Sequence, residues 1–125
     1  MYEDGLVFAC HAYPTPERPE VYLGWLTVET RRHIAGLADL TEAEGQALGG
    51  LIARLSRVLK AVTGAEHIYA FVIGHGAPHL HVHLLPRYPG TPREYWGVRV
   101  DEWEGAPHGG AEEIAGLCEK IRVAL

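Results

Sequence analysis

The chain has 125 residues, and its 11 Lys and Arg against 16 Asp and Glu give a formal net charge of −5. With 47% hydrophobic residues, the composition excludes a disordered or collagen-like chain. No basic run offers a surface for nucleic acid or for a polybasic membrane contact, and no apolar stretch reaches the roughly 18–20 residues of a membrane span.

The length predicts one domain over residues 1–125. The first residues carry neither a basic segment nor a long apolar segment of the kind found in signal peptides. The two cysteines, Cys10 and Cys118, form no CxxC pair, so we interpret them as free thiols. These features favour a cytoplasmic protein.

The first quarter of the chain predicts two strands. Residues 6–13 and 20–29 are rich in strand-forming residues, and the proline-rich stretch 14–19 separates them as a loop. In the second strand, one face carries Val21, Leu23, Trp25, Thr27 and Glu29, and the other carries Tyr22, Leu26 and Val28. A connector over 30–39 follows and contains His33.

A long amphipathic helix is predicted over residues 42–62. Thr41 and Glu44 have the spacing of a capping box, and Gly64 is a suitable stop. The apolar residues at steps of three and four are Leu48, Leu51, Ile52, Leu55, Val58, Leu59 and Val62. This stripe should face a core.

The second half predicts two more strands and a shorter helix. Residues 67–73 and 79–85 read as strands, with a turn over 74–78 between them and Pro86 as the end of the second. A Pro/Gly-rich segment with several aromatics and arginines covers 86–109, long enough to pack over a site or a partner. A C-terminal helix over 111–124, within residues 110–125, completes an α+β fold with a mostly antiparallel sheet of about five strands.

Three of the eight histidines, His79, His81 and His83, alternate with apolar residues. On a strand they share one face, roughly 7 Å apart, and the apolar residues form the core face. Three interpretations stay open at this point: a solvated polar face, a metal site, or a site of nucleophilic chemistry. A metal would need a third ligand such as His33, His75 or a carboxylate, and neither a CxxC nor an HExxH motif accompanies the histidines.

Nucleophilic chemistry fits this strand because a neutral imidazole can attack phosphorus and form a phosphoramidate bond. The neighbouring imidazoles can donate hydrogen bonds to phosphate oxygens or protonate a leaving group. Other nucleophiles do not fit: Ser56 lies within the predicted helix, and Cys10 and His11 are strand neighbours that point to opposite faces.

The stretch His79-Leu80-His81-Val82-His83-Leu84-Leu85, followed by Pro86-Arg87, resembles the signature of the histidine triad (HIT) family. Upstream, Gly24 through Arg31-Arg32-His33 and on to Asp39-Leu40 resembles the family segment that ends in a fourth histidine. The resemblance covers a core of about residues 2–87 and implies a HIT-like fold.

The resemblance implies a metal-independent nucleotide hydrolase or transferase that acts on the α-phosphate of a purine nucleotide or nucleotide conjugate, with no cofactor. His81 would be the nucleophile, His83 would contact phosphate, and His79 would support His81 and hydrogen-bond His33. Phosphate contacts are further expected from His75, Gly76 and Arg87. Two copies would form a homodimer whose sheets join.

The sequence also departs from the family pattern before the triad. His75 stands where a glutamine is usual, Gly76 stands where a serine or threonine is usual, and the chain contains no asparagine. A non-catalytic nucleotide-binding dimer that keeps the fold is therefore an alternative function, and a zinc-dependent hydrolase on the same strand is another.

Overall fold

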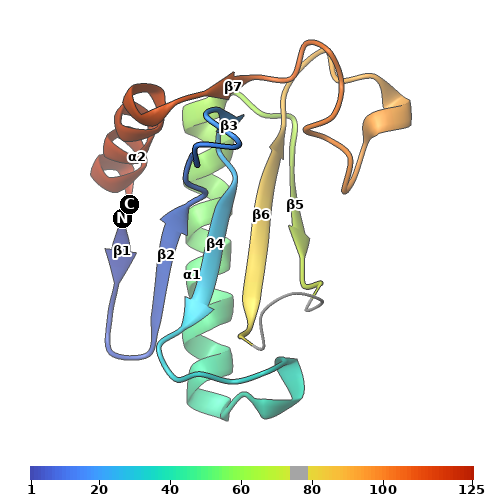
Figure 1. Cartoon of the computed structure of the whole chain (residues 1–125). Coiled ribbons are helices and arrows are strands. Elements are labelled where there is room, and N and C mark those ends of the chain that lie inside the picture. Colours follow the sequence, from blue (N-terminus) through green and yellow to red (C-terminus); the bar gives the residue numbers. More distant parts are fainter. Residues whose placement is uncertain (74–78) are drawn as a thin grey trace.

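A computed structural model describes residues 1–73 and 79–125. Its centre is a five-stranded antiparallel sheet in the order β1-β2-β4-β6-β5 (Figure 1). The strands are β1 (Tyr2–Glu3), β2 (Val7–His11), β4 (Leu26–Thr30), β6 (His81–Arg87) and β5 (His67–Phe71). The long helix α1 (Glu42–Thr63) covers one face, and α2 (Ala111–Ala124) lies at the β1 end (Figure 1). The predicted α+β fold is confirmed.

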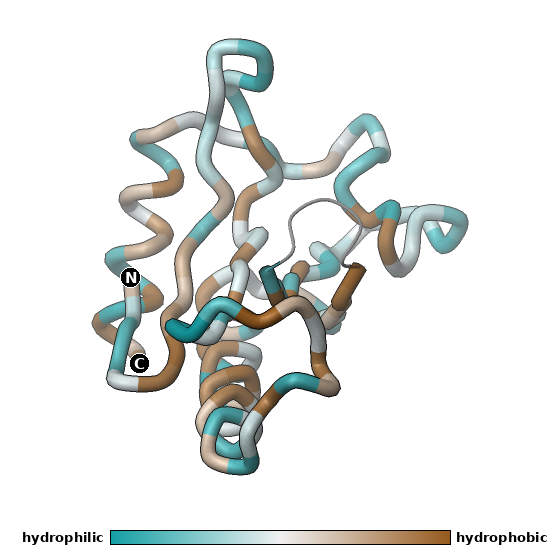
Figure 2. Tube along the Cα trace, turned by 60° about the horizontal axis from the view of Figure 1, so that its bottom comes forward, coloured by the Kyte–Doolittle hydropathy of each residue, from teal (hydrophilic) through white to brown (hydrophobic). Residues whose placement is uncertain are grey.

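Helix α1 forms where its capping and apolar patterns predict it. The Thr41 hydroxyl accepts a hydrogen bond from the Glu44 backbone N–H, and the Glu44 carboxylate accepts one from the Thr41 backbone N–H. Gly64 ends the helix in the left-handed conformation, with φ 72°. Hydropathy alternates along the helices (Figure 2), and the α1 residues Leu48, Leu51, Leu55 and Leu59 are buried against Val7, Ala9, Leu26, Val28, Leu80, Val82 and Leu84 of the sheet side.

The prediction of one strand over 20–29 is wrong, because the chain turns at Gly24. There φ is +91°, a conformation that favours glycine. The turn separates β3 (Val21–Tyr22) from β4. Strand β3 leaves the main sheet and pairs with β7 (His108–Gly109) in a second, two-stranded sheet.

The prediction that Pro86 ends its strand is also wrong. Strand β6 continues through Pro86, which pairs with Ile68 of β5, to Arg87. The Arg87 carbonyl accepts a hydrogen bond from the Glu66 backbone N–H on the β5 side. Because neighbouring residues of a strand direct their backbone groups to opposite sides, the Pro86 nitrogen points away from β5. On that side β4 has already left the sheet. A proline is tolerated there because no neighbouring strand needs its missing N–H.

The segment 86–109 folds back onto the chain itself. It contains a short 3-10 helix, η2 (Arg93–Tyr95), and β7, and its buried Val100 joins Tyr22 and Leu85 in a second apolar cluster. The Tyr88 hydroxyl donates to the Leu23 carbonyl and fastens the segment to the Gly24 turn. The predicted helix over 111–124 is confirmed as α2, and within the described ranges no helix is both long and apolar enough to cross a membrane.

Buried His11 predicts how stability depends on pH. Its Nε2 accepts the Gly24 N–H at 2.8 Å, and its Nδ1 lies 2.7 Å from the Ala12 carbonyl, so Nδ1 carries the proton and the ring is neutral. Burial lowers the pKa of His11, although the bond to Ala12 opposes this. The folded pKa then lies below the unfolded one, so the stabilisation is complete above about pH 6.5 and is lost as the pH falls below it.

We therefore expect the free energy of unfolding, measured with urea, to fall between pH 8 and pH 5.5. In His11→Gln, which offers Gly24 an acceptor that does not titrate, the fall should be smaller. An equal fall in both proteins would contradict this role of His11.

Candidate functional site

Strand pairing places polar side chains of three strands side by side on the sheet face opposite α1. Directly paired residues of antiparallel strands point to the same face. One row across the sheet joins Phe8 of β2, Glu29 of β4 and His81 of β6. The next row joins Cys10, Thr27, His83 and Phe71 of β5. The site is therefore built from residues that lie far apart in the sequence.

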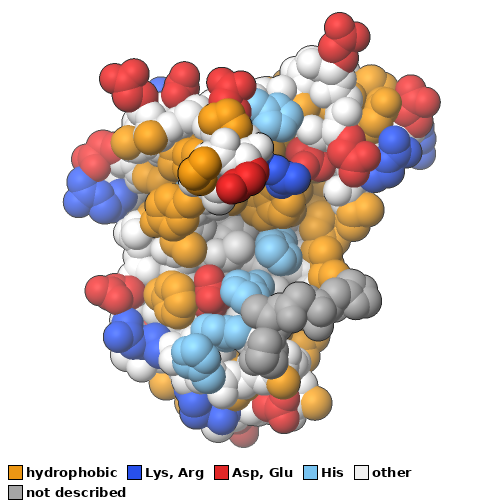
Figure 3. Space-filling view, viewed as in Figure 1, with side chains coloured by type: hydrophobic (Ala, Val, Ile, Leu, Met, Phe, Trp, Pro, Cys, Tyr) orange, Lys and Arg blue, Asp and Glu red, His pale blue; other side chains and the backbone are white. Residues whose placement is uncertain are grey.

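The three histidines lie in line, as the alternation predicts. The ring centroids of His79 and His81 are 5.2 Å apart, and those of His81 and His83 are 6.2 Å apart. Leu80, Val82 and Leu84, which alternate with the histidines, are buried on the α1 side. In the space-filling view the pale-blue histidine side chains run along the open face of the sheet (Figure 3).

His33 reaches the triad from the connector between β4 and α1. Arg32 makes a bidentate pair with Glu44, with distances of 3.0 and 2.7 Å, and its guanidinium lowers the pKa of Glu44 to about 2. This pair holds the connector against α1. The His33 ring packs on the His79 ring at 4.3 Å, while His79 Nε2 lies 3.3 Å from the Thr30 carbonyl. The structure thus brings His33 to His79 through ring contact and gives His79 a backbone hydrogen-bond partner.

Trp25 fixes the tautomer of His83. The indole Nε1–H donates to His83 Nδ1 at 3.0 Å, so the proton of the neutral ring is on Nε2. Burial and the neighbouring His81 lower the pKa of His83, and Glu29 opposes them. A neutral His83 therefore presents an Nε2–H donor to the site.

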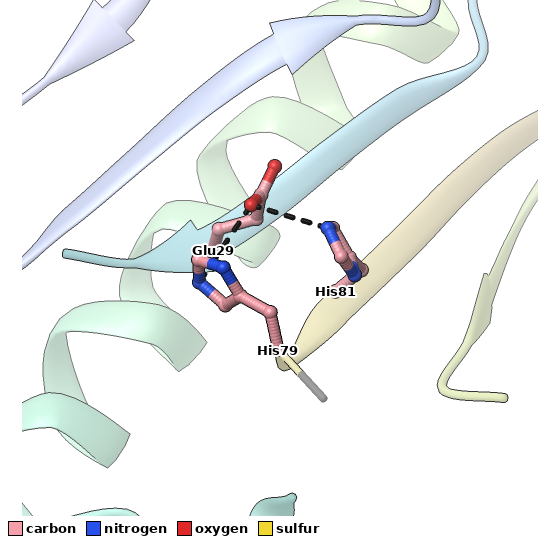
Figure 4. A group of neighbouring side chains, drawn as sticks. All are labelled: Glu29, His79 and His81. Atoms are coloured by element: carbon pink, nitrogen blue, oxygen red, sulfur yellow. Dashed lines mark ion pairs between the residues drawn. The ribbon is translucent and has the colours of Figure 1, made fainter. Parts of the chain in front are cut away.

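Glu29 is the site residue that the sequence motifs do not reveal. Its Oε1 lies 3.3 Å from His81 Nε2 and 3.8 Å from His79 Nε2 (Figure 4). Its Oε2 accepts from the Thr27 hydroxyl at 3.2 Å. The strand alternation does place Glu29 on one face with Trp25 and Thr27, but local sequence does not show which strand lies opposite. These three residues are also the group whose ligand atoms, all within 4.8 Å of one another, could hold a metal ion.

A cavity of about 820 Å³ begins at His83 and extends away from His79. Its walls include Tyr13, Tyr22, Trp25, Asp101 and His108. Asp101 and His108 belong to the segment 86–109, so that segment lines the cavity of its own chain. A volume of this size is typical of small-molecule sites.

The structure does not bring Arg87 to the triad. It lies four residues beyond His83 on β6, about 13 Å along the strand. Its guanidinium hydrogen-bonds the Tyr69 hydroxyl at 2.8 Å and stacks on Trp96, 3.7 Å from the ring centroid. The two other expected phosphate contacts, His75 and Gly76, lie outside the described residues.

Comparison with known proteins agrees with this geometry. A model of the HIT domain matches residues 1–90. The fold is similar to a histidine triad protein from Bradyrhizobium japonicum, with 25% identity, 98% of this chain and 86% of that chain covered, and a TM-score of 0.73. A histidine triad protein from Sinorhizobium meliloti is 28% identical over 81% of this chain and 74% of its own, with a TM-score of 0.67.

A hypothetical histidine triad nucleotide-binding protein from Sulfolobus tokodaii also shares the fold, at 23% identity over 98% of this chain and 80% of that chain, with a TM-score of 0.73. Among curated proteins, none matches the chain.

Proposed function

The chain belongs to the HIT domain family, and we propose that it is a nucleotide hydrolase or transferase that forms a covalent nucleotidyl–His81 intermediate. The observation that carries the proposal is the line of three imidazoles that ends at a cavity of about 820 Å³. A nucleoside in the cavity and an α-phosphate over the imidazoles would place the scissile bond beside His81. A purine nucleotide or nucleotide conjugate has these two parts.

In the first step, His81 Nε2 attacks the α-phosphorus. His81 attacks as the neutral ring with its proton on Nδ1, so the Nε2 lone pair forms the N–P bond. The bond from phosphorus to the leaving group breaks, and the leaving group departs with that electron pair and takes a proton from solvent. The Glu29 carboxylate, 3.3 Å from His81 Nε2, stabilises the positive charge of the nucleotidylated ring. The Nε2–H of His83 donates to a phosphate oxygen and stabilises the charge that develops there.

In the second step, water attacks the α-phosphorus and the N–P bond breaks. The electron pair of the N–P bond returns to Nε2, the proton that water loses passes to solvent, and the nucleoside monophosphate leaves. A second acceptor in place of water gives transfer instead of hydrolysis. The covalent step needs no metal, because the imidazole is itself the nucleophile.

We also propose that two copies of the chain pair through β5, the strand at one end of the five-stranded sheet. Its outer edge has no neighbouring strand among the described residues, and the adjoining Val72 and Ile73 are exposed. An uncovered edge of this kind is a template for pairing with another strand. The resulting homodimer would join two sheets into one.

The test is the intact mass of the protein after brief mixing with adenosine 5′-phosphoramidate or a diadenosine polyphosphate, in EDTA. We expect an added mass of one adenylyl group that maps to the peptide containing His81, together with release of AMP. Binding of the nucleotide without an adduct or turnover would instead support the non-catalytic binding function.

A further inference from the structure

We propose that Glu29, His79 and His81 form a binding site for a divalent transition-metal ion, with Zn²⁺ as its representative. Glu29 lies on β4, His81 lies on the neighbouring β6, and His79 lies two residues before β6. The three side chains converge on one point (Figure 4). Two imidazoles and one carboxylate are a donor set that zinc takes in open, reactive sites.

The distances suit a tetrahedral ion. Zinc bonds of about 2.0–2.1 Å to nitrogen and oxygen place neighbouring ligand atoms about 3.3–3.4 Å apart. Glu29 Oε1 lies 3.3 Å from His81 Nε2 and 3.8 Å from His79 Nε2. All three ligand atoms fall within 4.8 Å of one another. Small side-chain rotations, in which His79 Nε2 leaves the Thr30 carbonyl, would therefore complete three corners of a tetrahedron and leave the fourth for water or substrate.

The surroundings hold the carboxylate in the required orientation. The Glu29 side chain is only 10% exposed. Its Oε2 accepts from Thr27 at 3.2 Å, and the Cys10 sulfur lies 4.0 Å away, so Oε1 is the oxygen that faces the imidazoles. Such partners fix the orientation of metal-binding carboxylates and raise their affinity.

Charge gives a second reason for a cation at this point. A buried carboxylate is costly unless a positive partner lies beside it. A divalent ion held between Glu29, His79 and His81 would be such a partner.

Metal binding at this site and nucleotidylation of His81 exclude each other. This consequence rests on the proposed function. His81 Nε2 has one lone pair, which either binds the ion or attacks phosphorus. Metal binding at Glu29, His79 and His81 would thus hold the protein in a state that cannot be nucleotidylated, and removal of the metal would release the nucleophile.

The first experiment measures metal binding without any activity. The protein is stripped with EDTA, desalted and titrated with Zn²⁺ in a calorimeter. We expect one equivalent to bind, and we expect Glu29→Gln and His79→Ala to bind it at least about 10-fold more weakly. Loss of a group that only orients a metal ligand already weakens binding by about this factor. Glu104→Gln and His67→Ala remove an exposed carboxylate and an exposed histidine elsewhere and should bind as the unaltered chain does. Equal affinity in Glu29→Gln would overturn the site.

X-ray absorption of the zinc-loaded, unaltered protein gives an answer even where a variant fails to fold. We expect a shell of nitrogen and oxygen at about 2.0–2.1 Å; a sulfur shell at about 2.3 Å would assign the ion to a cysteine and overturn the site.

The second experiment adds Zn²⁺ to the adenylylation reaction. We expect adduct formation to stop at one equivalent of zinc and to return with EDTA. An adduct formed as fast with zinc bound would overturn the exclusion. A protein that binds zinc at these residues but forms no adduct without it would refute the proposed function and leave the metal site standing.

Discussion

Replacing His81 by alanine is expected to lower turnover of a nucleotide conjugate by on the order of 10⁴-fold or more, the size of effect that follows loss of a nucleophile. Among the described residues, neither neighbouring imidazole of the triad can take its place. His79 is turned toward the Thr30 carbonyl, and the Nδ1 lone pair of His83 is already occupied by Trp25. The measurement is steady-state release of AMP in EDTA, with nucleotide affinity measured separately.

Affinity for the nucleotide should change little in His81→Ala, because the cavity walls begin at His83 and do not include His81. His67→Ala is the matched control: it removes an exposed imidazole of β5 that does not line this cavity. If His81→Ala retained turnover comparable to that of His67→Ala, His81 would not be the nucleophile.

Local patterns were enough to predict the elements that carry the triad. Alternation placed Leu80, Val82 and Leu84 on the buried face and the histidines on the other, and burial confirms it. Thr41 and Glu44 placed the start of α1. These predictions depend on neighbours within four residues, where side-chain direction follows from the backbone alone.

What the sequence could not predict depends on strand pairing. The contact of Glu29 with His81 exists because these residues are partners across β4 and β6, 52 positions apart in the chain. The position of Pro86 inside β6 is tolerated only because β4 turns away before reaching it. The cavity likewise needs Asp101 to return beside Tyr22. Register between distant strands is set by the packed whole, not by any local motif.

We expect Gly24→Ala, in the turn between β3 and β4, to destabilise the protein by about 2–4 kcal/mol. This loss is the sum of backbone strain and a steric clash. The residue has φ +91°, and an added Cβ would lie 2.7 Å from Pro86 Cγ and 3.3 Å from Leu59 Cδ1. The Pro86 ring is fixed within β6 and cannot rotate away. The measurement is the free energy of unfolding in urea.

Gly64→Ala separates the two causes. Gly64 also has a positive φ, +72°, but a Cβ there would meet nothing within 4 Å, so only strain of about 1 kcal/mol is expected. Equal losses in the two variants would show that the contact with Pro86 contributes nothing.

The clash at Gly24 should also affect the site. Trp25 follows Gly24 directly, and its indole holds His83 in the tautomer that donates to phosphate. Gly24→Ala should therefore also slow adenylylation under conditions in which it is fully folded, whereas Gly64→Ala should not.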